Sequence, residues 1–342
     1  MSDNSPAVVA ARRKKYFDAD SRDFEFGGLI ASGGHGDAYK IRERSPDGSP
    51  GRRFVAKFAV NDPISIADLR KEIETTRQLY GAFHIVQPVV DNGNLRSLPN
   101  IPSSAPAEDR LMLCMEYLPG ITFADFIHRA QQWDVIPNRV LCMVFLCLLA
   151  LGNPPRKPFG ASTECPETEV VPEKEPTAKD YQIFHGDMDN HYNLVFGDFD
   201  VDEHWLVPVL KAIDFGIAID KIGSNISGYI MHNISPGTFT QANIYHIGRA
   251  MQQLYAHYSP ASLLNLDNDL SNLAAKCVSW HHQDRPSLRE LVDTIEYAIR
   301  TKTGPESFPG MPWANSETTQ MIRHYVADVM LSATQLDDFK VP

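Results

Sequence analysis

The segments that decide the fold are Phe184–Asp187 (FHGD) and Ile213–Gly216 (IDFG), with Asn193 between them. Each segment places an aspartate, Asp187 or Asp214, beside a short apolar run. Carboxylate and amide oxygens are hard ligands that suit Mg²⁺. Aspartates at strand ends are usually turn formers. The ordered combination of two aspartates and one asparagine nevertheless favours a site that holds Mg²⁺ beside a phosphate.

Length and composition predict a globular protein with a large core. The chain has 342 residues, of which 43% are hydrophobic and 22% charged. Its net charge of −11 argues against a nucleic-acid partner, because such surfaces are usually basic. The most apolar stretch, Val140–Leu151, is shorter than the roughly 18 residues of a membrane-spanning helix. We therefore expect a buried core helix there and no membrane partner.

Cysteine usage and the N-terminus bear on the compartment. The five cysteines lack CxxC spacing and are interpreted as reduced, mostly core thiols. Met1–Ala11 has no apolar segment typical of a secretory signal. These features predict a cytoplasmic protein, with the nucleus as the alternative. Residues 1–21 are expected to be a disordered tail whose basic run Arg12–Lys15 is solvated, or else a targeting patch.

The N-terminal third of the chain reads as strands around one helix. The helix is expected over Ile64–Leu79, and residues 91–110 look like a flexible insertion. Alternating apolar residues and turn signals predict antiparallel strands at Phe24–Ser32, His35–Arg42, Arg53–Val60, His84–Val90 and Leu111–Tyr117.

After Gly120 the pattern becomes mainly helical. Residues 152–180 are rich in Pro and Glu and are expected to be a disordered insertion. Residues 301–342 are expected to form a C-terminal extension with an amphipathic helix at about 317–331. Other helices are predicted at Phe123–Gln132, Asn138–Leu151, Gln241–Tyr258, Asp269–Trp280 and Ser287–Arg300, and short strands at Gln182–Phe184, Leu194–Phe196 and Val209–Ile213.

Residues 22–300 resemble eukaryotic-type protein kinases. The opening segments are similar to the kinase signatures H-R-D-x-x-x-x-N and D-F-G. Asn243–Gly248 resembles the start of the kinase αF helix, and Cys277–Pro286 resembles the segment that carries a buried arginine. The resemblance implies an α+β, bilobal protein kinase-like fold. Its small lobe, residues 22–117, would be a five-stranded antiparallel sheet with one helix, and its large lobe, residues 118–300, would be mainly helical.

The same resemblance implies ATP and Mg²⁺ as cofactors. Asp187 would orient a hydroxyl and accept its proton, Asp214 would chelate Mg²⁺, and Asn193 would bind a second ion. Lys57 would neutralise α- and β-phosphate charge and would be held by Glu72. Glu74 is the rival for this ion pair, and a solvated helix charge is the ordinary interpretation of either glutamate.

The resemblance also implies a nucleotide pocket. Met115 would be the gatekeeper, while the Glu116 carbonyl and the Leu118 amide would face adenine. From the residues alone, the glycine-rich turn could be a plain hairpin and Lys57 a surface lysine. The positions expected to contact ATP are Ile30, Gly33, Gly34, Gly36, Ala38, Val55, Lys57, Met115, Glu116, Leu118 and Val195.

Several positions depart from the kinase pattern. Asn193 follows Asp187 by six positions rather than five, so it needs a one-residue bulge, with Asn190 as the substitute ligand. Gly186 replaces an arginine, which predicts no phosphorylation switch. Asp189 stands where Ser/Thr kinases keep a lysine. There is no A-P-E motif, Asn243 replaces an aspartate, and Arg285 lacks its usual glutamate partner.

The function predicted from these features is ATP- and Mg²⁺-dependent phosphoryl transfer to a hydroxyl, most simply Ser or Thr of a protein substrate. Two alternatives remain. One is a small-molecule kinase resembling aminoglycoside or choline phosphotransferases, which the His-Gly-Asp motif favours. The other is a pseudokinase that binds nucleotide or partners, which the altered spacing of Asn193 and the acid at Asp189 favour.

Overall fold

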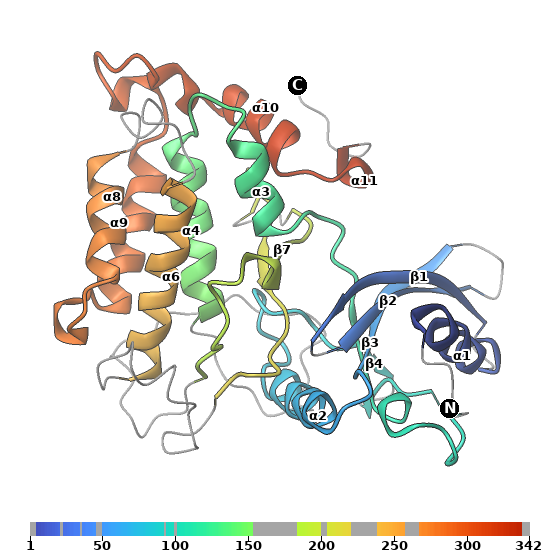
Figure 1. The fold of residues 1–342 in the computed structure, drawn as a ribbon. Helices are drawn as coiled ribbons and strands as arrows, with labels where there is room; N and C mark the ends of the chain where they lie inside the picture. The colour runs from blue at the N-terminus through green and yellow to red at the C-terminus, as the bar shows by residue number, and fades with distance from the viewer. Residues whose placement is uncertain are drawn as a thin grey trace.

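The chain forms a mixed α+β structure in a computed structural model (Figure 1). A small antiparallel sheet lies on one side and a group of helices on the other, an arrangement compatible with two lobes. The structure describes residues 5–20, 23–34, 36–45, 50–91, 94–98, 101–152, 183–199, 204–219, 238–256 and 267–336.

The main sheet has four strands rather than the five expected. Their order is β1-β2-β3-β6, all antiparallel: β1 (Phe24–Gly33), β2 (Gly36–Arg44), β3 (Pro50–Phe58) and β6 (Met112–Glu116). To this sheet the predicted strand His84–Val90 contributes one bridged pair, Pro88 with Met115, while Ile85 forms a parallel bridge with Ala212. Proline lacks an amide hydrogen and is tolerated only at such an edge. The chain then turns into a separate pair, β4 (Val90–Asp91) and β5 (Asn94–Leu95).

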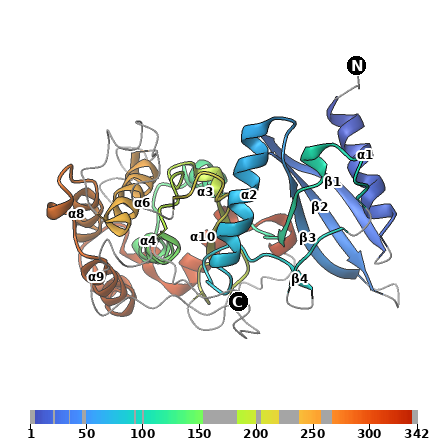
Figure 2. The same ribbon diagram turned by 90° about the horizontal axis from the view of Figure 1, so that it is seen from below.

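Helix α2 (Pro63–Gln78) lies between the sheet and the helices (Figure 2). It begins at Asp62, whose carboxylate accepts a hydrogen bond from the Ser65 amide at 2.9 Å. This cap satisfies one of the amides left unpaired at a helix start. The helix predicted from the sequence is confirmed within one residue at each end.

Most of the further helices in the described part of the chain build the other side of the molecule. Helix α4 is buried almost all round, as expected from its continuous apolar sequence. Among the described residues, none of the helices combines the length and apolarity needed to cross a bilayer. The bounds are α3 (Phe123–Ala130), α4 (Asn138–Gly152), α6 (Phe239–Ala256), α8 (Asn268–Cys277) and α9 (Leu288–Thr301).

A two-stranded ladder connects the helices to the sheet region. β7 (Leu194–Phe196) pairs antiparallel with β8 (Leu210–Ala212). The Val86 amide donates to the Ala212 carbonyl at 3.0 Å, which joins β8 to the segment after α2. In the described part of the third predicted strand, Gln182–Phe184, Phe184 forms a bridge with Ile219.

The C-terminal extension is part of the core. Helix α10 (Thr319–Val329) confirms the predicted amphipathic helix, although Met321 in its first turn is exposed. Before it, the buried Glu317 accepts hydrogen bonds from the amides of Asn138 and Arg139 at the start of α4. A carboxylate from a distant segment thus caps α4, where the helix dipole favours negative charge.

The prediction of a disordered tail over residues 1–21 is wrong for the part described. Residues Pro6–Asp18 form helix α1, which packs on β1. Phe17 is fully buried and its ring contacts those of Phe24 and Phe58. Burial of Phe17 and Tyr16 against the sheet helps to order this helix.

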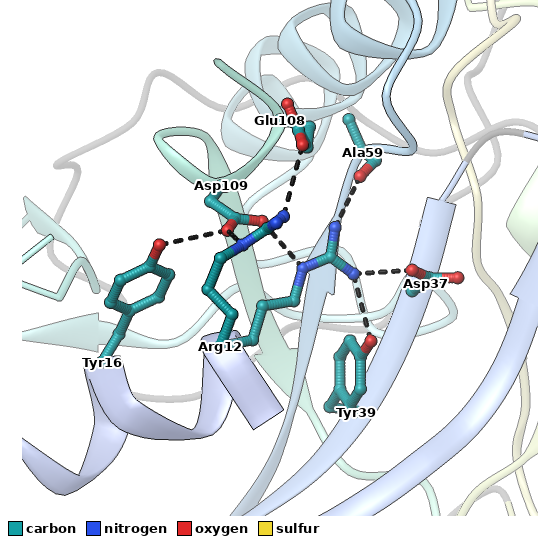
Figure 3. Close-up of polar contacts among 8 residues, drawn as sticks. Arg12, Tyr16, Asp37, Tyr39, Ala59, Glu108 and Asp109 are labelled. Carbon is teal, nitrogen blue, oxygen red and sulfur yellow. Dashed lines mark hydrogen bonds and ion pairs between the residues drawn. The ribbon is translucent and has the colours of Figure 1, made fainter. Parts of the chain in front are cut away.

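Arg13 anchors α1 to the sheet through the acceptors Asp37, Tyr39, Ala59 and Asp109, which Figure 3 labels. Its side chain is 1% exposed and donates to Asp109 at 2.9 Å, Asp37 at 2.6 Å, and the Ala59 carbonyl at 2.8 Å. Tyr39 accepts a further bond at 3.1 Å. The predicted solvated basic run is therefore wrong at this position, because buried acceptors match the donors of the guanidinium.

Arg12 and the loop before β6 complete this network. Arg12 donates to Asp109 and Glu108, and the Tyr16 hydroxyl donates to Asp109 at 3.1 Å. Asp109 is fully buried. The expected flexible insertion at residues 91–110 is thus wrong for its last part, which α1 fixes to the sheet.

The described residues include only part of the predicted insertion and four of the five cysteines. The proposed disordered insertion at 152–180 lies outside the described residues, except for its first residue, Gly152, which ends α4. Within the described chain the cysteines are buried thiols without a disulfide, as predicted: Cys114, Cys142, Cys147 and Cys277.

Replacing Arg13 by Met should lower the free energy of unfolding by about 3 kcal/mol, because two aspartates lose a buried partner. Urea denaturation of the full chain measures this change. Lys14→Met is the matched control: its ammonium pairs with Asp18 at the surface, so the change should stay within about 0.5 kcal/mol. Equal effects of both substitutions would contradict the anchoring role of Arg13.

Candidate functional site

Lys57 is the centre of a buried charge cluster. It lies on β3 opposite Ala38 and is 9% exposed. Its ammonium lies 2.7 Å from Glu72 Oε2 on α2 and 2.9 Å from Asp214 Oδ1. The surface-lysine interpretation is therefore wrong for Lys57.

The ion pair belongs to Glu72 and not to its rival, Glu74. Glu72 is 2% exposed and faces the sheet. Glu74 points outward, where its Oε1 accepts a hydrogen bond from Gln78 Nε2 at 3.0 Å. Two residues of helix separate the glutamates by about 200° around the axis, so only one of them can face β3.

Burial and charge act in opposite directions on these three groups. Burial alone would lower the pKa of Lys57, but Glu72 and Asp214 outweigh it and raise that pKa. Burial also raises the pKa of Glu72, and the Lys57 ammonium offsets this only in part. For Asp214, the Lys57 charge outweighs burial and lowers the pKa. With all three groups charged, the cluster carries one net negative charge, which suits a cation.

Asp214 has a strained backbone. It follows β8 and adopts a φ of 62°, in the left-handed region that non-glycine residues rarely enter. The Gly216 amide donates to its Oδ1 at 3.4 Å, in addition to the Lys57 ammonium. Strained residues of this kind cluster at functional sites, where the surrounding structure holds them in place.

Asp187 and Asn193 are in direct contact despite their extra spacing. Asn193 Nδ2 donates to Asp187 Oδ2 at 2.7 Å, and Asn190 Nδ2 donates to the same oxygen at 3.1 Å. A short 3-10 helix, η2 (His191–Asn193), takes up the additional residue. Both asparagines contact the aspartate, and the need for a bulge relative to the kinase spacing stays a prediction.

The preceding residues fix the loop that carries Asp187. His185 is buried; its Nε2 lies 3.1 Å from the Ile213 carbonyl, and its Nδ1 accepts from the Asp187 amide at 3.3 Å. Burial lowers the pKa of His185, which favours the neutral imidazole. Gly186 has a φ of 84°, so this turn requires glycine, and an arginine here would be strained.

The two parts of the site meet through the β7–β8 ladder. The Ile213 amide donates to the Asn193 carbonyl at 2.9 Å, immediately before Asp214. The His185 ring packs on Phe215 at a centroid distance of 4.6 Å. Backbone pairing therefore places Asp187 with Asn193 on one side and Asp214 with Lys57 on the other side of one junction. Such a set of oxygens and one ammonium is suited to a divalent ion beside an anionic ligand.

The apolar residues predicted to line a nucleotide pocket also gather near this junction. Val55 pairs with Met115 across the sheet, and both belong to one apolar cluster with Leu118 and Ile213. Ile30, further along β1, is exposed. Val195 lies on β7, paired with Lys211 and bridged to Thr122.

The Glu116 side chain has a structural role that the sequence did not indicate. Its Oε1 accepts from the Gln87 amide at 2.8 Å and from Lys211 Nζ at 2.7 Å. These contacts join the end of β6 to β8. They leave the prediction for the Glu116 backbone carbonyl untested.

The glycine-rich turn between β1 and β2 has glycines of two kinds. A Cβ at Gly36 would collide with the Phe58 carbonyl oxygen, so packing on β3 requires glycine there. A Cβ at Gly33 or Gly34 would meet no atom within 4 Å, and neither residue has a left-handed φ. Packing and backbone strain thus do not explain these two glycines, whereas close approach of a ligand would.

Two further contacts at this turn were missed from the sequence. Ser65 Oγ on α2 donates to the Gly34 carbonyl at 3.2 Å. Asp37 accepts from Ser32 Oγ at 2.7 Å while it pairs with Arg13 of α1. The only available signal was the acid that follows Gly36, since these partners lie far away in the sequence.

The departures from the kinase pattern have defined surroundings. Asp189 Oδ1 lies 3.2 Å from His246 Nδ1, and this hydrogen bond lowers the pKa of Asp189. Asn243 donates to the carbonyls of Gly152 and Ile183. Arg285 donates to backbone carbonyls, such as that of Gln241 at 2.7 Å, and so binds its surroundings without a glutamate.

A scan against protein-family models gave no match for this chain, and a search of curated proteins gave no significant relative.

The pH dependence of stability should differ between wild type and Glu72→Gln. The folded-state pKa of Glu72 is raised from 4.5 to about 7, so the native state keeps a proton that the unfolded chain has lost. Stability from this carboxyl is present below pH 4.5 and is lost as the pH rises through about 7. The slope contributed is at most about 1.4 kcal/mol per pH unit.

Thermal unfolding at a series of pH values measures this effect. The Tm of wild type should fall relative to that of Glu72→Gln as the pH rises across this window. Glu74→Gln is the control, and its Tm should run parallel to that of wild type. A constant difference between wild type and Glu72→Gln would contradict the raised pKa.

Proposed function

We propose that this chain has a protein kinase-like fold and transfers the γ-phosphoryl group of Mg²⁺-ATP to a hydroxyl, most simply that of Ser or Thr in a protein substrate. The observation that supports this most is the contact of Lys57 with both Glu72 and Asp214. One ammonium held by two acids from different parts of the chain is a positioned cation beside a metal-binding carboxylate.

The proposed nucleotide site lies against β3 and β6. The adenine would rest on the apolar cluster that includes Val55, Met115 and Leu118. Lys57 would contact the α- and β-phosphates, and amides near Gly33 and Gly34 would approach the phosphate oxygens. Glycine has no Cβ, so the backbone of this turn can approach a phosphate closely. The packing around Gly33 and Gly34 does not itself require glycine.

The proposed metal site uses Asp214 and the carbonyl oxygen of the Asn193 side chain. Asn193 donates through Nδ2 to Asp187, and a carboxamide oriented in this way can offer its oxygen to a cation. Mg²⁺ prefers such oxygen ligands together with phosphate oxygens. With Glu72 ionised, the net negative charge around Lys57 is consistent with a divalent ion.

Asp187 is the proposed base. Both asparagines donate to its Oδ2, so an acceptor hydroxyl would donate to Oδ1. In the transfer, the hydroxyl oxygen forms the bond to the γ-phosphorus, the bond from that phosphorus to the β,γ-bridging oxygen breaks, and ADP leaves. Asp187 takes the hydroxyl proton.

A nucleotide-binding pseudokinase is the second candidate. Asp189 favours it, because this acid stands two positions after Asp187, where Ser/Thr kinases keep a lysine that assists transfer. The Asp189 carboxylate is held by its contact with His246. A small-molecule acceptor remains the third alternative. The two experiments below separate these three functions.

ATP with Mg²⁺ should raise the Tm of wild type, since a ligand bound at 100 times its Kd stabilises by about 2.7 kcal/mol. Asp214→Asn should lose most of the additional shift that Mg²⁺ provides. Asp198→Asn, an exposed aspartate after β7, should respond like wild type. Absence of any ATP-dependent shift in wild type would contradict nucleotide binding.

Asp187→Asn should lower phosphoryl transfer by about 10²- to 10⁴-fold, because the proton acceptor is lost. The Mg²⁺-ATP thermal shift should be retained. Transfer of labelled phosphate to a panel of generic proteins and to a panel of metabolites measures the activity and the acceptor class. Wild type that binds Mg²⁺-ATP without any transfer would favour the pseudokinase, and undiminished transfer by Asp187→Asn would refute the role of Asp187.

A further inference from the structure

Three buried side chains with metal-binding chemistry meet near β8. They are His84, in the segment after α2, Cys147 on α4, and His204, which precedes β8. Their exposures are 2%, 1% and 5%. None of them belongs to the proposed phosphoryl-transfer site, and 120 positions separate the two histidines in sequence.

Their donor atoms converge. His84 Nε2 lies 3.1 Å from His204 Nε2, and Cys147 Sγ lies 3.9 Å from His204 Nδ1. One ligand atom can be chosen from each side chain so that all three lie within 4.8 Å of one another. In a tetrahedral zinc site two nitrogens are about 3.3 Å apart, and nitrogen and sulfur about 3.6 Å apart. The two short distances involve different nitrogens of His204, and an ion can bind only one of them. With one ligand atom from each residue the separations are within 4.8 Å, so the three side chains close around an ion after shifts of about 1 Å.

Thiolate and imidazole together are the donors that borderline metals prefer. Carboxylates and carbonyls suit Mg²⁺ and Ca²⁺, whereas Cys with His suits Zn²⁺. We propose that His84, Cys147 and His204 bind a zinc ion with its fourth position filled by water or a small anion. This site is independent of the proposed phosphoryl transfer.

Zinc binds a cysteine as the thiolate, so loading of this site releases the thiol proton. Cys142 lies on the same helix and is also buried, but it is not part of the cluster. A trio of hydrogen bonds without metal is the alternative that the test must distinguish.

Aromatic packing restrains the two imidazoles. The Phe83 ring stacks on His204 at a centroid distance of 5.7 Å and meets His84 edge-on at 5.3 Å. Rings held in this way lose little freedom when they bind an ion. The His84 carbonyl also accepts from the Ala212 amide at 2.9 Å, so an ion here would connect α4 and the segment after α2 with β8.

The test uses the full chain, produced without a polyhistidine tag, stripped with a chelator and then reloaded with Zn²⁺ alone. After removal of excess metal, inductively coupled plasma mass spectrometry should find about one zinc ion per chain. The zinc content of Cys147→Ser should be lower than that of wild type by roughly tenfold or more. Cys142→Ser is the matched control, since it removes a buried thiol from the same helix, and it should retain as much zinc as wild type.

A second measurement requires no variant. Loading the stripped wild-type chain with Co²⁺ should produce a thiolate-to-cobalt charge-transfer absorption in the near ultraviolet, and Zn²⁺ should displace it. Zinc should also raise the Tm of wild type, because it binds the folded chain. Wild type that retains no zinc, equal retention by wild type and a folded Cys147→Ser chain, or Co²⁺ loading without a thiolate band would each overturn the proposal.

Discussion

The position of one ammonium group constrains both sides of this molecule. Lys57 projects from the sheet, and its partners Glu72 and Asp214 come from α2 and from the end of β8. Breaking a buried pair of this kind costs several kcal/mol, because a charge is left without a partner. The contact thus fixes the distance between the sheet and the ladder that carries the acidic residues. The positions of Asp187 and Asn193 are tied to this contact, because the Asn193 carbonyl accepts a hydrogen bond from the amide of Ile213, the residue before Asp214.

Much of the fold was predictable from local patterns. The continuous apolar run at Val140–Leu151 gave a buried helix, and β7 was predicted at the residues where it occurs. Glu72 could not be separated from Glu74 in the sequence, because the apolar face of α2 is imperfect. The packing of that helix against β6 and β3 decides between them. The bulge after Asp187 was foreseen as a need, but its form, a 3-10 turn, depends on hydrogen bonds of Asn190 and Asn193 that the spacing does not encode.

The features that the sequence concealed depend on contacts between distant residues. Arg13 and Asp109 are 96 positions apart, and Glu317 caps a helix that begins 179 positions earlier. A basic run in a polar segment is ordinarily solvated, and only the acceptors brought together by folding make Arg13 a buried residue. The predicted fifth strand is reduced to one bridged pair around Pro88, and that bridge depends on β6, which lies further along the chain.

The same strand lies between both proposed metal sites. The Ala212 amide of β8 donates a hydrogen bond to the His84 carbonyl, and the strand ends two residues before Asp214. An ion held by His84, Cys147 and His204 would therefore restrain the strand from the side of α4, while the Lys57 ammonium restrains the residue that follows it. Asp214 keeps a strained φ, and such a conformation persists only where the surrounding structure determines it. Restraint at β8 and at the residue that follows it would hold Asp214 in the conformation that binds a ligand. The ligand would then not have to spend binding energy on ordering this loop.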